Sequence, residues 1–284
     1  MSFQFPASQP SATHLTAARI ATFGAPQSDQ IDIEVVAETG STNADLLARI
    51  GTVGADSMPP ALTRPTLLVA ETQTAGRGRA GRAWLSAPSA ALTFSLAWPF
   101  EGPLQGLVGL PLAVGVAIAE TLAGFGVDVQ LKWPNDILRF GSKLAGVLIE
   151  TASSAQGKVW AVIGIGINIA IPDEIRQQIG RDIANLQALA AQDRDLLLGV
   201  LLSSLTHNMQ QFERDGLAVF VERWNRLHAY AGQTVVILDH GKVLHEGTAL
   251  GIDRIGRLLL QTDKDSTPIA IMAGDISLRV KDPE

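Results

Sequence analysis

The pattern of apolar and polar residues divides this 284-residue chain into three regions. Residues 1–30 are rich in Ser, Pro, Ala and Thr and lack hydrophobic periodicity, so we expect a poorly ordered extension there. Residues 31–230 combine strand-like and helix-like patterns, which predicts one main domain that contains both strands and helices. In residues 231–284, short alternating segments separated by turn signals predict a small all-β barrel.

Strands and helices are predicted wherever the hydrophobic period is clear. In the larger region, strands are predicted at residues 31–36, 66–70, 91–98, 127–133, 144–150 and 159–170, and helices at residues 42–50, 194–214 and 217–230. In the smaller region, strands are predicted at residues 234–238, 243–251, 257–261 and 269–272. Thr42 and Asp45 have the spacing of a capping box, which predicts a helix start.

Residues 102–119 carry no charge and are long enough to raise the question of a membrane span. The run contains Pro103, Pro111 and four glycines, and it ends at Glu120. We therefore expect a helix that is buried against a sheet and no association with a membrane.

Composition excludes several classes of protein. The net charge of −6 gives no basic face for a dedicated nucleic-acid binder. The chain has no cysteine, which excludes disulfides, thiol nucleophiles and thiolate metal sites, and its five histidines lack metal-ligand spacing. Since the N-terminus also lacks the pattern of a secretory signal, we expect a cytoplasmic protein.

Residues 76–82 hold three glycines and three arginines directly after a predicted strand. Glycine allows the backbone to approach a ligand and leaves amides free to face an anion. Arginine adds a planar set of donors for carboxylate or phosphate. The loop is therefore a candidate anion-binding cover; a solvated surface loop and an RNA-binding segment are the alternatives.

Three further segments carry candidate ligand groups. Ser41 and Thr42 lie at a predicted helix start, where hydroxyls and free amides either cap the helix or bind a polar ligand. Lys132 and Asp136 flank a rigid turn, which suits either phosphate and Mg²⁺ binding or a simple ion pair. Lys143 begins a predicted strand, either facing a ligand or as a solvated edge residue.

Gly164 and Gly166 interrupt an apolar strand that ends at Asn168. A dinucleotide-binding fingerprint is excluded, because Ile169 occupies the position of the third glycine and no helix pattern follows. Glycines inside a strand instead indicate close approach of another backbone or of a ligand.

Taken together, these segments resemble the bacterial biotin protein ligases, from about residue 35 to the C-terminus and in the order of that family. The matching positions are Ser41-Thr42-Asn43, Gln73, Gly76-Arg77-Gly78-Arg79, Arg82, Trp84, Lys132-Trp133-Pro134-Asn135-Asp136, Lys143-Leu144-Ala145-Gly146 and Gly164-Ile165-Gly166-Ile167-Asn168. The resemblance implies an α+β fold, with a mixed-sheet catalytic domain of the class II synthetase-like, biotin–lipoyl ligase type, followed by an SH3-like barrel.

The resemblance also implies a reaction in two steps. Biotin and ATP, with Mg²⁺, give biotinyl-5′-AMP and pyrophosphate, and a lysine of a biotin carboxyl carrier protein domain then accepts the biotin. No protein nucleophile is needed, so the enzyme contributes positioning and charge stabilisation. The groups implied as catalytic are Arg77, Arg79, Lys132 and Lys143.

Binding roles follow from the same resemblance. For biotin they fall on Ser41, Thr42, Asn43 and Gln73 at the ureido head, on Gly146 beside it, and on Gly76, Arg77, Gly78, Arg79 and Lys143. For ATP they fall on Arg79, Arg82, Trp84, Lys132, Asp136, Asn168 and Ile183, with Asp136 as the metal ligand and Asn168 at the adenine. Arg77 is expected deepest in the loop, at the reacting carboxylate and α-phosphate, and Arg79 further out, where it helps to fold the loop over the adenylate. Arg279 of the barrel is expected to approach the nucleotide.

Two departures from the family shape the remaining expectations. Thirty residues stand where repressor-type relatives carry a winged helix, so no specific DNA binding is expected. Ile183 stands where those relatives place a tryptophan over the adenine. A monomer or weak homodimer is expected. The alternative functions are a lipoyl ligase or octanoyltransferase of the same superfamily, and a non-enzymatic biotin-responsive regulator.

Overall fold

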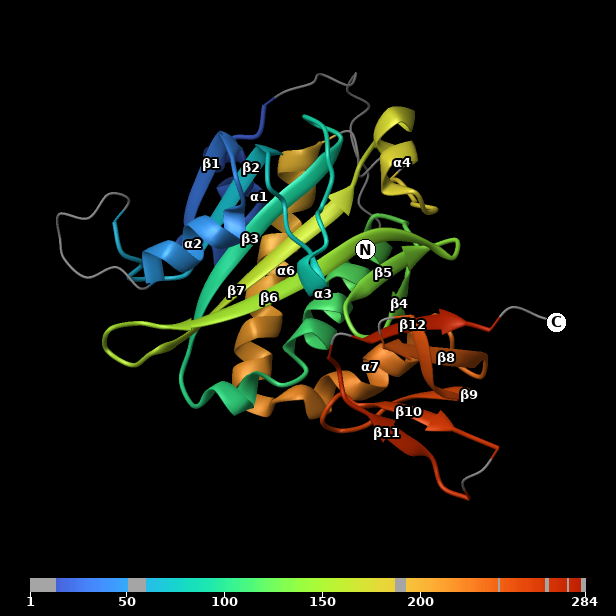
Figure 1. The fold of residues 1–284 in the computed structure, drawn as a ribbon. Helices are drawn as coiled ribbons and strands as arrows, with labels where there is room; N and C mark the ends of the chain where they lie inside the picture. The colour runs from blue at the N-terminus through green and yellow to red at the C-terminus, as the bar shows by residue number, and fades with distance from the viewer. Residues whose placement is uncertain are drawn as a thin grey trace.

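The computed structural model describes residues 14–50, 60–186, 193–239, 241–263, 266–274 and 276–281. Its strands form two sheets (Figure 1), a seven-stranded one of order β1-β2-β3-β7-β6-β5-β4 and a five-stranded one of order β11-β10-β9-β8-β12. In the larger sheet β1 and β2 run parallel. All other neighbouring strands described in the two sheets are antiparallel. The mixed sheet followed by an antiparallel one confirms the predicted fold class.

The larger sheet follows the sequence prediction except at one edge. Its strands are β1 (Asp32–Thr39), β2 (Thr66–Gln73), β3 (Ala91–Phe100), β4 (Gln130–Lys132), β5 (Asp136–Arg139), β6 (Ser142–Ser153) and β7 (Val159–Asn168). The strand predicted at residues 127–133 is shorter than expected, because the chain turns at residues 133–135 and returns as β5, which was not predicted.

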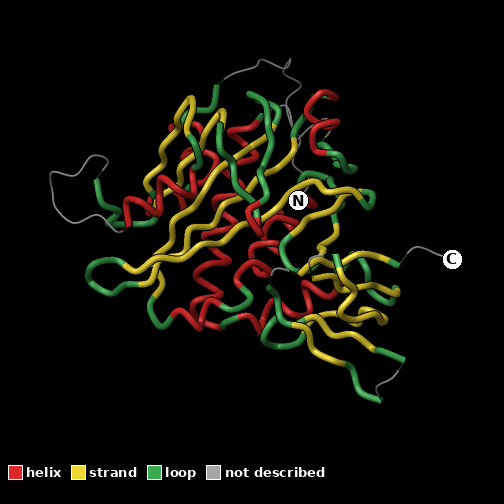
Figure 2. Tube along the Cα trace, in the orientation of Figure 1, coloured by secondary structure: helices red, strands yellow, loops and turns green. Residues whose placement is uncertain are grey.

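Helices cover both faces of this sheet (Figures 1 and 2). On one face, α3 (Leu110–Gly124) and α6 (Arg194–Asp215) pack in the main core with Leu67 of β2 and Ile163 of β7. On the other face, α2 (Thr42–Ile50) packs against Leu68 and Val162, which are the next residues along the same strands. The alternation of side chains in the strands therefore separates two apolar layers.

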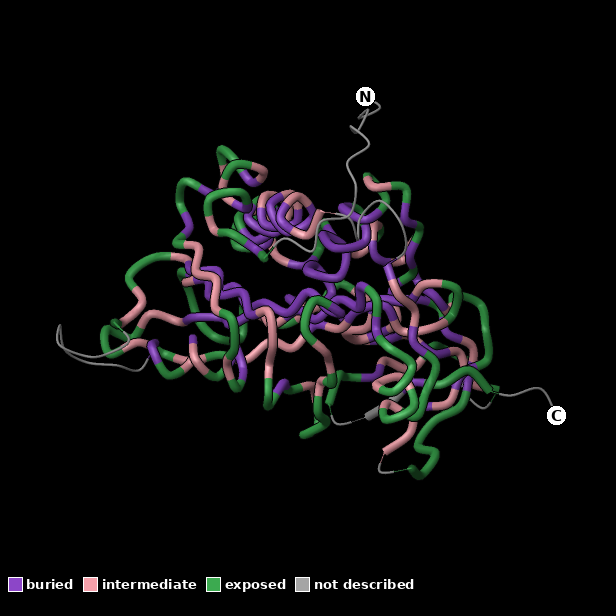
Figure 3. Tube along the Cα trace, turned by 90° about the horizontal axis from the view of Figure 1, so that it is seen from above, coloured by how far each residue is buried: buried purple, intermediate pink, exposed green. Residues whose placement is uncertain are grey.

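The uncharged run found in the sequence lies mainly in α3, inside the molecule. Residues Leu104–Gly124 have the length and hydropathy of a membrane span, but most of the segment is buried by the sheet and by α6. Figure 3 shows the buried helices above the sheet layer. The expectation of a buried helix is confirmed. Two shorter helices are α4 (Asp173–Ile179) and α7 (Val221–Arg226), of which α7 contacts α3.

The expected disorder of the N-terminal extension is wrong for residues 14–30. Residues Ala17–Gly24 form α1, which packs on α6, and Leu15 and Ile20 are buried in the main core. Backbone amides of this segment are held by two distant carboxylates: Leu15 N donates to Glu71 and Thr16 N to Asp195, each at 2.8 Å. Residues 1–13 of the predicted extension lie outside the described residues.

The helix start at Thr42 differs from the predicted capping box. Asp45 accepts a hydrogen bond from the hydroxyl of Thr39, while the hydroxyl of Thr42 turns toward Gln73 and Ser95. The side chain that accepts from the first turn is Ser41, whose Oγ lies 3.5 Å from the amide of Ala44. Thr42 therefore does not cap the helix, and its hydroxyl faces Gln73 of β2 and Ser95 of β3.

The smaller sheet contains β8 (Thr234–Asp239), β9 (Lys242–Ile252), β10 (Leu258–Gln261), β11 (Ile269–Ile271) and β12 (Ile276–Val280). The predicted segments become the first four strands, and β12 was not predicted. The two sheets are joined by a hydrogen bond from Nε1 of the buried Trp133 to the carbonyl of Gly256, at 3.0 Å. This contact fixes the turn at residues 133–135 against the smaller sheet.

Candidate active site

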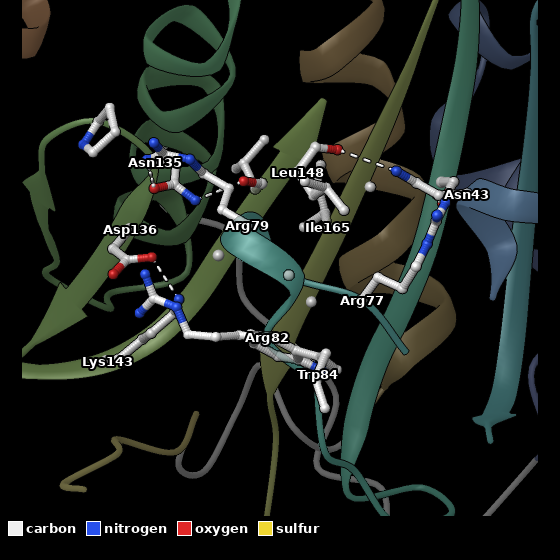
Figure 4. A pocket seen from close by; sticks show the side chains of 18 of the residues that line it. Asn43, Arg77, Arg79, Arg82, Trp84, Asn135, Asp136, Lys143, Leu148 and Ile165 are labelled. Carbon is white, nitrogen blue, oxygen red and sulfur yellow. Dashed lines mark hydrogen bonds and ion pairs between the residues drawn. The ribbon is translucent and has the colours of Figure 1, made fainter. Parts of the chain in front are cut away.

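A cavity opens on the face of the larger sheet that carries α2. Its walls come from the start of α2, the loop at residues 76–84, the β4–β5 hairpin, β6, β7 and β12 (Figure 4). The predicted site residues that line it are Ser41, Thr42, Asn43, Gln73, Arg77, Gly78, Arg79, Arg82, Trp84, Lys132, Asp136, Lys143, Gly146 and Arg279. Segments that lie far apart in the sequence are thus brought to one place.

The strand glycines make room for two side chains of the cavity. A Cβ at Gly164 would collide with the amide group of Asn43, and a Cβ at Gly166 would collide with the indole of Trp84. Gly146 is paired with Gly166 in the β6–β7 register and also lies against Trp84. These glycines mark close approaches, as predicted, but the approaching groups are side chains of this chain and not another backbone or a ligand.

One end of the cavity holds a buried network of neutral polar groups. The hydroxyl of Thr42 lies 2.6 Å from Oγ of Ser95. The Ser95 hydroxyl in turn donates to Oδ1 of Asn43 at 2.5 Å. The backbone amide of Thr42 donates to Oε1 of Gln73 at 2.9 Å. Thr42, Asn43 and Ser95 are each at most 3% exposed. Such a network in a protein interior holds its donors and acceptors in fixed directions.

Arg77 belongs to this neutral end. Its Nη2 donates to Oε2 of Glu150 at 2.8 Å, and the same oxygen accepts from Nδ2 of Asn43 at 2.8 Å. Arg79 points the other way, donating to Oδ1 of Asn135 at 3.0 Å and to the carbonyl of Gly274. Figure 4 shows the two arginines directed to opposite ends of the cavity. Arg77 was expected at the reacting carboxylate and α-phosphate, whereas in this structure it is paired with Glu150 at the neutral end.

The other end of the cavity is cationic. Lys132 and Asp136 are direct partners in the β4–β5 hairpin, and Nζ of Lys143 lies 2.5 Å from Oδ1 of Asp136. Arg79 and Arg82 are directed to the same end (Figure 4). Arg181 and Arg279 complete its lining. With one carboxylate among these cations, this end is suited to a polyanion.

Burial lowers the pKa of Lys132 to about 8, and the positive charge of Arg279 acts in the same direction. Asp136 opposes both, and the charges of Lys143 and Arg181 add smaller decreases. An anion placed among these cations would favour the charged form of Lys132.

Three predicted site residues do not line the cavity. Gly76 forms the base of the loop, where its carbonyl accepts from Trp84 N at 2.9 Å. Asn168 donates to the carbonyls of Lys143 and Ala184, at 3.1 and 3.2 Å. Ile183 forms a backbone bridge with Lys143 and packs in a small apolar cluster. Asn168 and Ile183 therefore hold the start of β6, where Lys143 is located.

Several residues of the site were missed in the sequence. Ser95 lies inside an apolar strand and Glu150 at a predicted strand end, so local pattern gave no reason to select them. Asn135 was quoted only as part of a motif, yet its Nδ2 donates to Val147 O at 2.8 Å and its Oδ1 holds Arg79. Arg181 follows α4 without any periodic signal. Thr93 and Ser95 are both polar in the otherwise apolar run 91–98, so polarity alone did not single out Ser95.

The two ends suit a ligand pair that is neutral and polar at one extremity and anionic at the other. Two anions that must react would repel each other, and preorganised cations in a partly dry cavity reduce this repulsion. The loop at residues 76–82 crosses the cavity between its ends. It is therefore positioned to cover the place where neutral head and anionic tail meet.

Comparison with known proteins identifies relatives of this chain. Residues 56–168 match the biotin/lipoate A/B protein ligase family, and residues 230–279 match the biotin protein ligase C-terminal domain. The bifunctional ligase/repressor BirA of Escherichia coli strain K12 is 35% identical over 255 residues, covering 89% of this chain and 76% of that protein. The biotin–[acetyl-CoA-carboxylase] ligase of Mycobacterium tuberculosis is 34% identical over 251 residues, covering 86% and 88%.

A solved structure agrees with these relatives. The biotin protein ligase of Aquifex aeolicus in complex with biotin and ATP has a TM-score of 0.66 and 30% identity, covering 88% of this chain and 99% of that one. On the strength of its fold, its cavity and these relatives, the chain belongs to the biotin protein ligase family.

Proposed function

We propose that this protein is a biotin protein ligase that activates biotin with ATP and transfers it to a lysine of a biotin carboxyl carrier protein domain. The observation that carries the proposal is the single cavity with a neutral polar network at one end and a cation cluster at the other. The related Aquifex enzyme was solved with biotin and ATP together, which supports this pair of substrates.

The neutral end is proposed to hold the ureido head of biotin. A ureido group carries one acceptor oxygen and two N–H donors, so it needs a site with fixed donors and acceptors. Ser41, Thr42, Asn43 and Gln73 supply these groups, and the network through Ser95 fixes their directions. The Trp84 ring against Gly146 and Gly166 supplies an apolar wall.

The cationic end is proposed to carry out the first step. The biotin carboxylate oxygen forms a bond to the α-phosphorus of ATP while the bond from that phosphorus to the bridging oxygen of pyrophosphate breaks. Arg79, Lys132 and Lys143 neutralise the carboxylate and phosphate oxygens, and Arg82 lies beside them. The protein supplies no covalent intermediate; it positions two anions and stabilises charge.

Mg²⁺ fits this site as a partner of the ATP phosphates. No group of three or more Asp, Glu or His side chains that could enclose a metal is found among the described residues. Asp136 provides one carboxylate beside the cation cluster, and Mg²⁺ commonly binds through one or two carboxylates plus substrate phosphates. When bound, the ion would neutralise phosphate charge. Asp136 would then exchange its contact with Lys143 for the metal.

In the second step, the neutral amine of an acceptor lysine attacks the acyl carbon of biotinyl-AMP. A C–N bond forms, the bond to the AMP phosphate oxygen breaks, AMP leaves, and the amine releases a proton to solvent. Water would destroy the same mixed anhydride, so the loop at residues 76–82 has a second purpose as a cover. The acceptor is proposed to be a cytoplasmic carrier domain.

The division of labour in the chain follows from these roles. Residues 31–230 are proposed to form the catalytic domain and residues 231–284 the barrel, which contributes Arg279 of β12 to the cavity. Asn168 and Ile183 are proposed to shape the adenine site through the backbone that they hold beside Lys143.

Exchange of radiolabelled pyrophosphate into ATP tests the first step without any acceptor protein. With Mg²⁺, the exchange is expected only when biotin is added, because biotinyl-AMP formation must be reversible on the enzyme. Lipoate and octanoate serve as matched carboxylates for the superfamily alternatives. Exchange that depends on lipoate and not on biotin would overturn the proposal, and so would the absence of exchange with every carboxylate.

A further inference from the structure

Glu150 stands next to the neutral end of the cavity without lining it. It lies on β6, its side chain is 29% exposed, and its Oε2 accepts hydrogen bonds from both Asn43 and Arg77. The sheet and α2 need no carboxylate at this position for packing, since the apolar cluster of α2 is formed by other residues. The contact with Asn43 gives this carboxylate a chemical consequence.

An ionised carboxylate only accepts hydrogen bonds, so it can face the NH₂ side of an amide but not the oxygen side. The carbonyl of Leu148 lies 3.4 Å from Nδ2 of Asn43 and imposes the same requirement. Both Nδ2 hydrogens are thereby directed to Glu150 and Leu148. Oδ1 of Asn43 is then left to face Ser95.

The direction of the amide passes to the next group. Because Oδ1 of Asn43 can only accept, the single hydrogen of Ser95 Oγ must point toward it, at 2.5 Å. Ser95 has then no hydrogen for Thr42, so the hydroxyl of Thr42 is the donor in their 2.6 Å contact, and this shorter contact takes the hydrogen in preference to Oε1 of Gln73 at 3.2 Å. The orientation of three buried groups is thus set in one direction from Asn43, whose amide is held by the charged Glu150 at 2.8 Å and by the more distant carbonyl of Leu148 at 3.4 Å.

We propose that Glu150 is a positioning residue for biotin: it fixes the Asn43 amide and, through it, the pattern of donors and acceptors that the ureido head meets. The inference rests on the proposed function and deepens it at the same site. A ligand with one acceptor and two donors binds well only if each donor and acceptor of the protein stays in one place. The Asn43 amide must therefore keep a single orientation. A flipped amide would place an acceptor where a donor is needed and leave a buried group unpaired.

Three substitutions of Glu150 differ in what they offer to Asn43. Gln keeps an acceptor oxygen that can receive from both Asn43 and Arg77, Ala removes the acceptor, and Lys replaces it with a donor that favours the flipped amide. Biotin affinity, measured by calorimetry without ATP, is expected to fall in the order Gln, Ala, Lys. We expect Gln to remain within about threefold of wild type, and Ala and Lys to lose about tenfold or more.

The steady-state constants separate positioning from general damage. For Glu150→Ala and Glu150→Lys, the KM for biotin is expected to rise while the KM for ATP and kcat stay near wild type. Glu101→Gln is a matched control, because Glu101 is also ion-paired, with Lys158 at 2.6 Å, but lies away from the cavity. Melting temperatures of all variants report whether the fold is retained, and Glu150→Gln keeps the shape of the side chain in any case.

A double-mutant cycle identifies the route of the effect. If Glu150 acts through Asn43, then Glu150→Ala has no further effect on biotin affinity in an Asn43→Ala background, and keeps its full effect in an Arg77→Gln background. Three results would overturn the inference: unchanged biotin affinity in the Ala and Lys variants, a Gln variant as weak as Ala, or an effect that disappears with Arg77. Wild-type pyrophosphate exchange is measured in parallel, so a failure of the proposed function is recognised separately.

Discussion

The indole of Trp84 lies directly against the backbone of Gly166, so closely that a Cβ at this glycine would overlap the ring. Gly146 is the register partner of Gly166 and lies against the same ring. Two glycines on adjacent strands therefore form a shallow seat for one aromatic side chain. The seat connects the loop at residues 76–84 to the floor of the cavity.

Substitution of Gly166 tests this seat. In Gly166→Ala the indole must move, which displaces the loop and the biotin wall that it forms. We expect kcat/KM for biotin to fall at least tenfold, equivalent to about 1.4 kcal/mol of transition-state stabilisation. Gly124→Ala is the control, because no atom lies within 4 Å of a Cβ at that glycine. Equal activity of the two variants would show that the seat does not matter.

Lys143 is the cation most closely tied to the proposed chemistry. Its Nζ contacts Asp136 and lies 5.7 Å from the centre of the Trp84 ring, at the junction of the neutral and cationic ends. Lys143→Ala is expected to slow biotinyl-AMP formation at least tenfold, or about 1.4 kcal/mol, in a rapid-quench assay. Lys158→Ala removes a surface lysine and serves as the control. Unchanged adenylation in Lys143→Ala would show that this lysine, although paired with Asp136, is not needed for the first step.

The lowered pKa of Lys132 predicts a pH dependence of stability. In the unfolded chain the lysine stays protonated up to about pH 10.5, whereas burial lowers its folded pKa to about 8. Below about pH 8 the folded protein therefore bears the cost of a buried charge, and this cost disappears as pH rises from 8 to 10.5. Lys132→Met should be more stable than wild type at pH 7, by thermal unfolding, and the difference should shrink above pH 8.

ATP binding should weaken over the pH range in which the cost of the buried Lys132 charge disappears. Loss of the Lys132 proton removes a positive charge from the cationic end, so the KM for ATP should rise above about pH 8 in wild type. Lys132→Arg keeps its charge and should lack this rise. A stability gap between wild type and Lys132→Met that is constant from pH 7 to 10 would contradict the account of this lysine.

Glu71 holds the N-terminal segment to the larger sheet through the amide of Leu15. Burial of this carboxylate opposes its ionisation, but hydrogen bonds from Arg194 and from the amide of Leu15 outweigh burial and lower its pKa. The stabilisation is present above the ordinary value near 4.5 and is lost as pH falls through the lower folded value.

Glu71→Gln should therefore lower the free energy of unfolding at pH 7 by about 3 kcal/mol, as is usual when a buried ion pair loses one partner. The gap in melting temperature to wild type should close below about pH 4.5. Protease cleavage within residues 14–30 should become faster in the variant. If the gap persists unchanged at pH 3, the ion pair with Arg194 is not its source.

Much of the fold was readable from the sequence because strand and helix periods are local properties. The apolar strands and α6 were predicted, and Gly164 and Gly166 correctly indicated a close approach. Ser95 and Glu150 were missed, because their meaning arises from partners 52 and 107 residues away at Asn43.

The errors have the same origin. Leu15 and Ile20 occur in a segment whose composition suggests disorder, and the carboxylate of Asp195 that anchors it is 179 residues away. Thr42 has the spacing of a cap, but contact with Ser95 and Gln73 directs its hydroxyl elsewhere. Propensity describes a residue and its neighbours, whereas long-range contacts decided these positions.

Intact mass spectrometry of an acceptor tests the central claim most directly. The protein is incubated with ATP, Mg²⁺, biotin and a biotin carboxyl carrier domain, with a second carrier sample whose acceptor lysine is replaced by arginine. The account predicts the addition of one biotin to the first carrier and none to the second, with both ATP and biotin required. Transfer of lipoate but not biotin, or an unmodified carrier under conditions in which ATP is consumed, would contradict it.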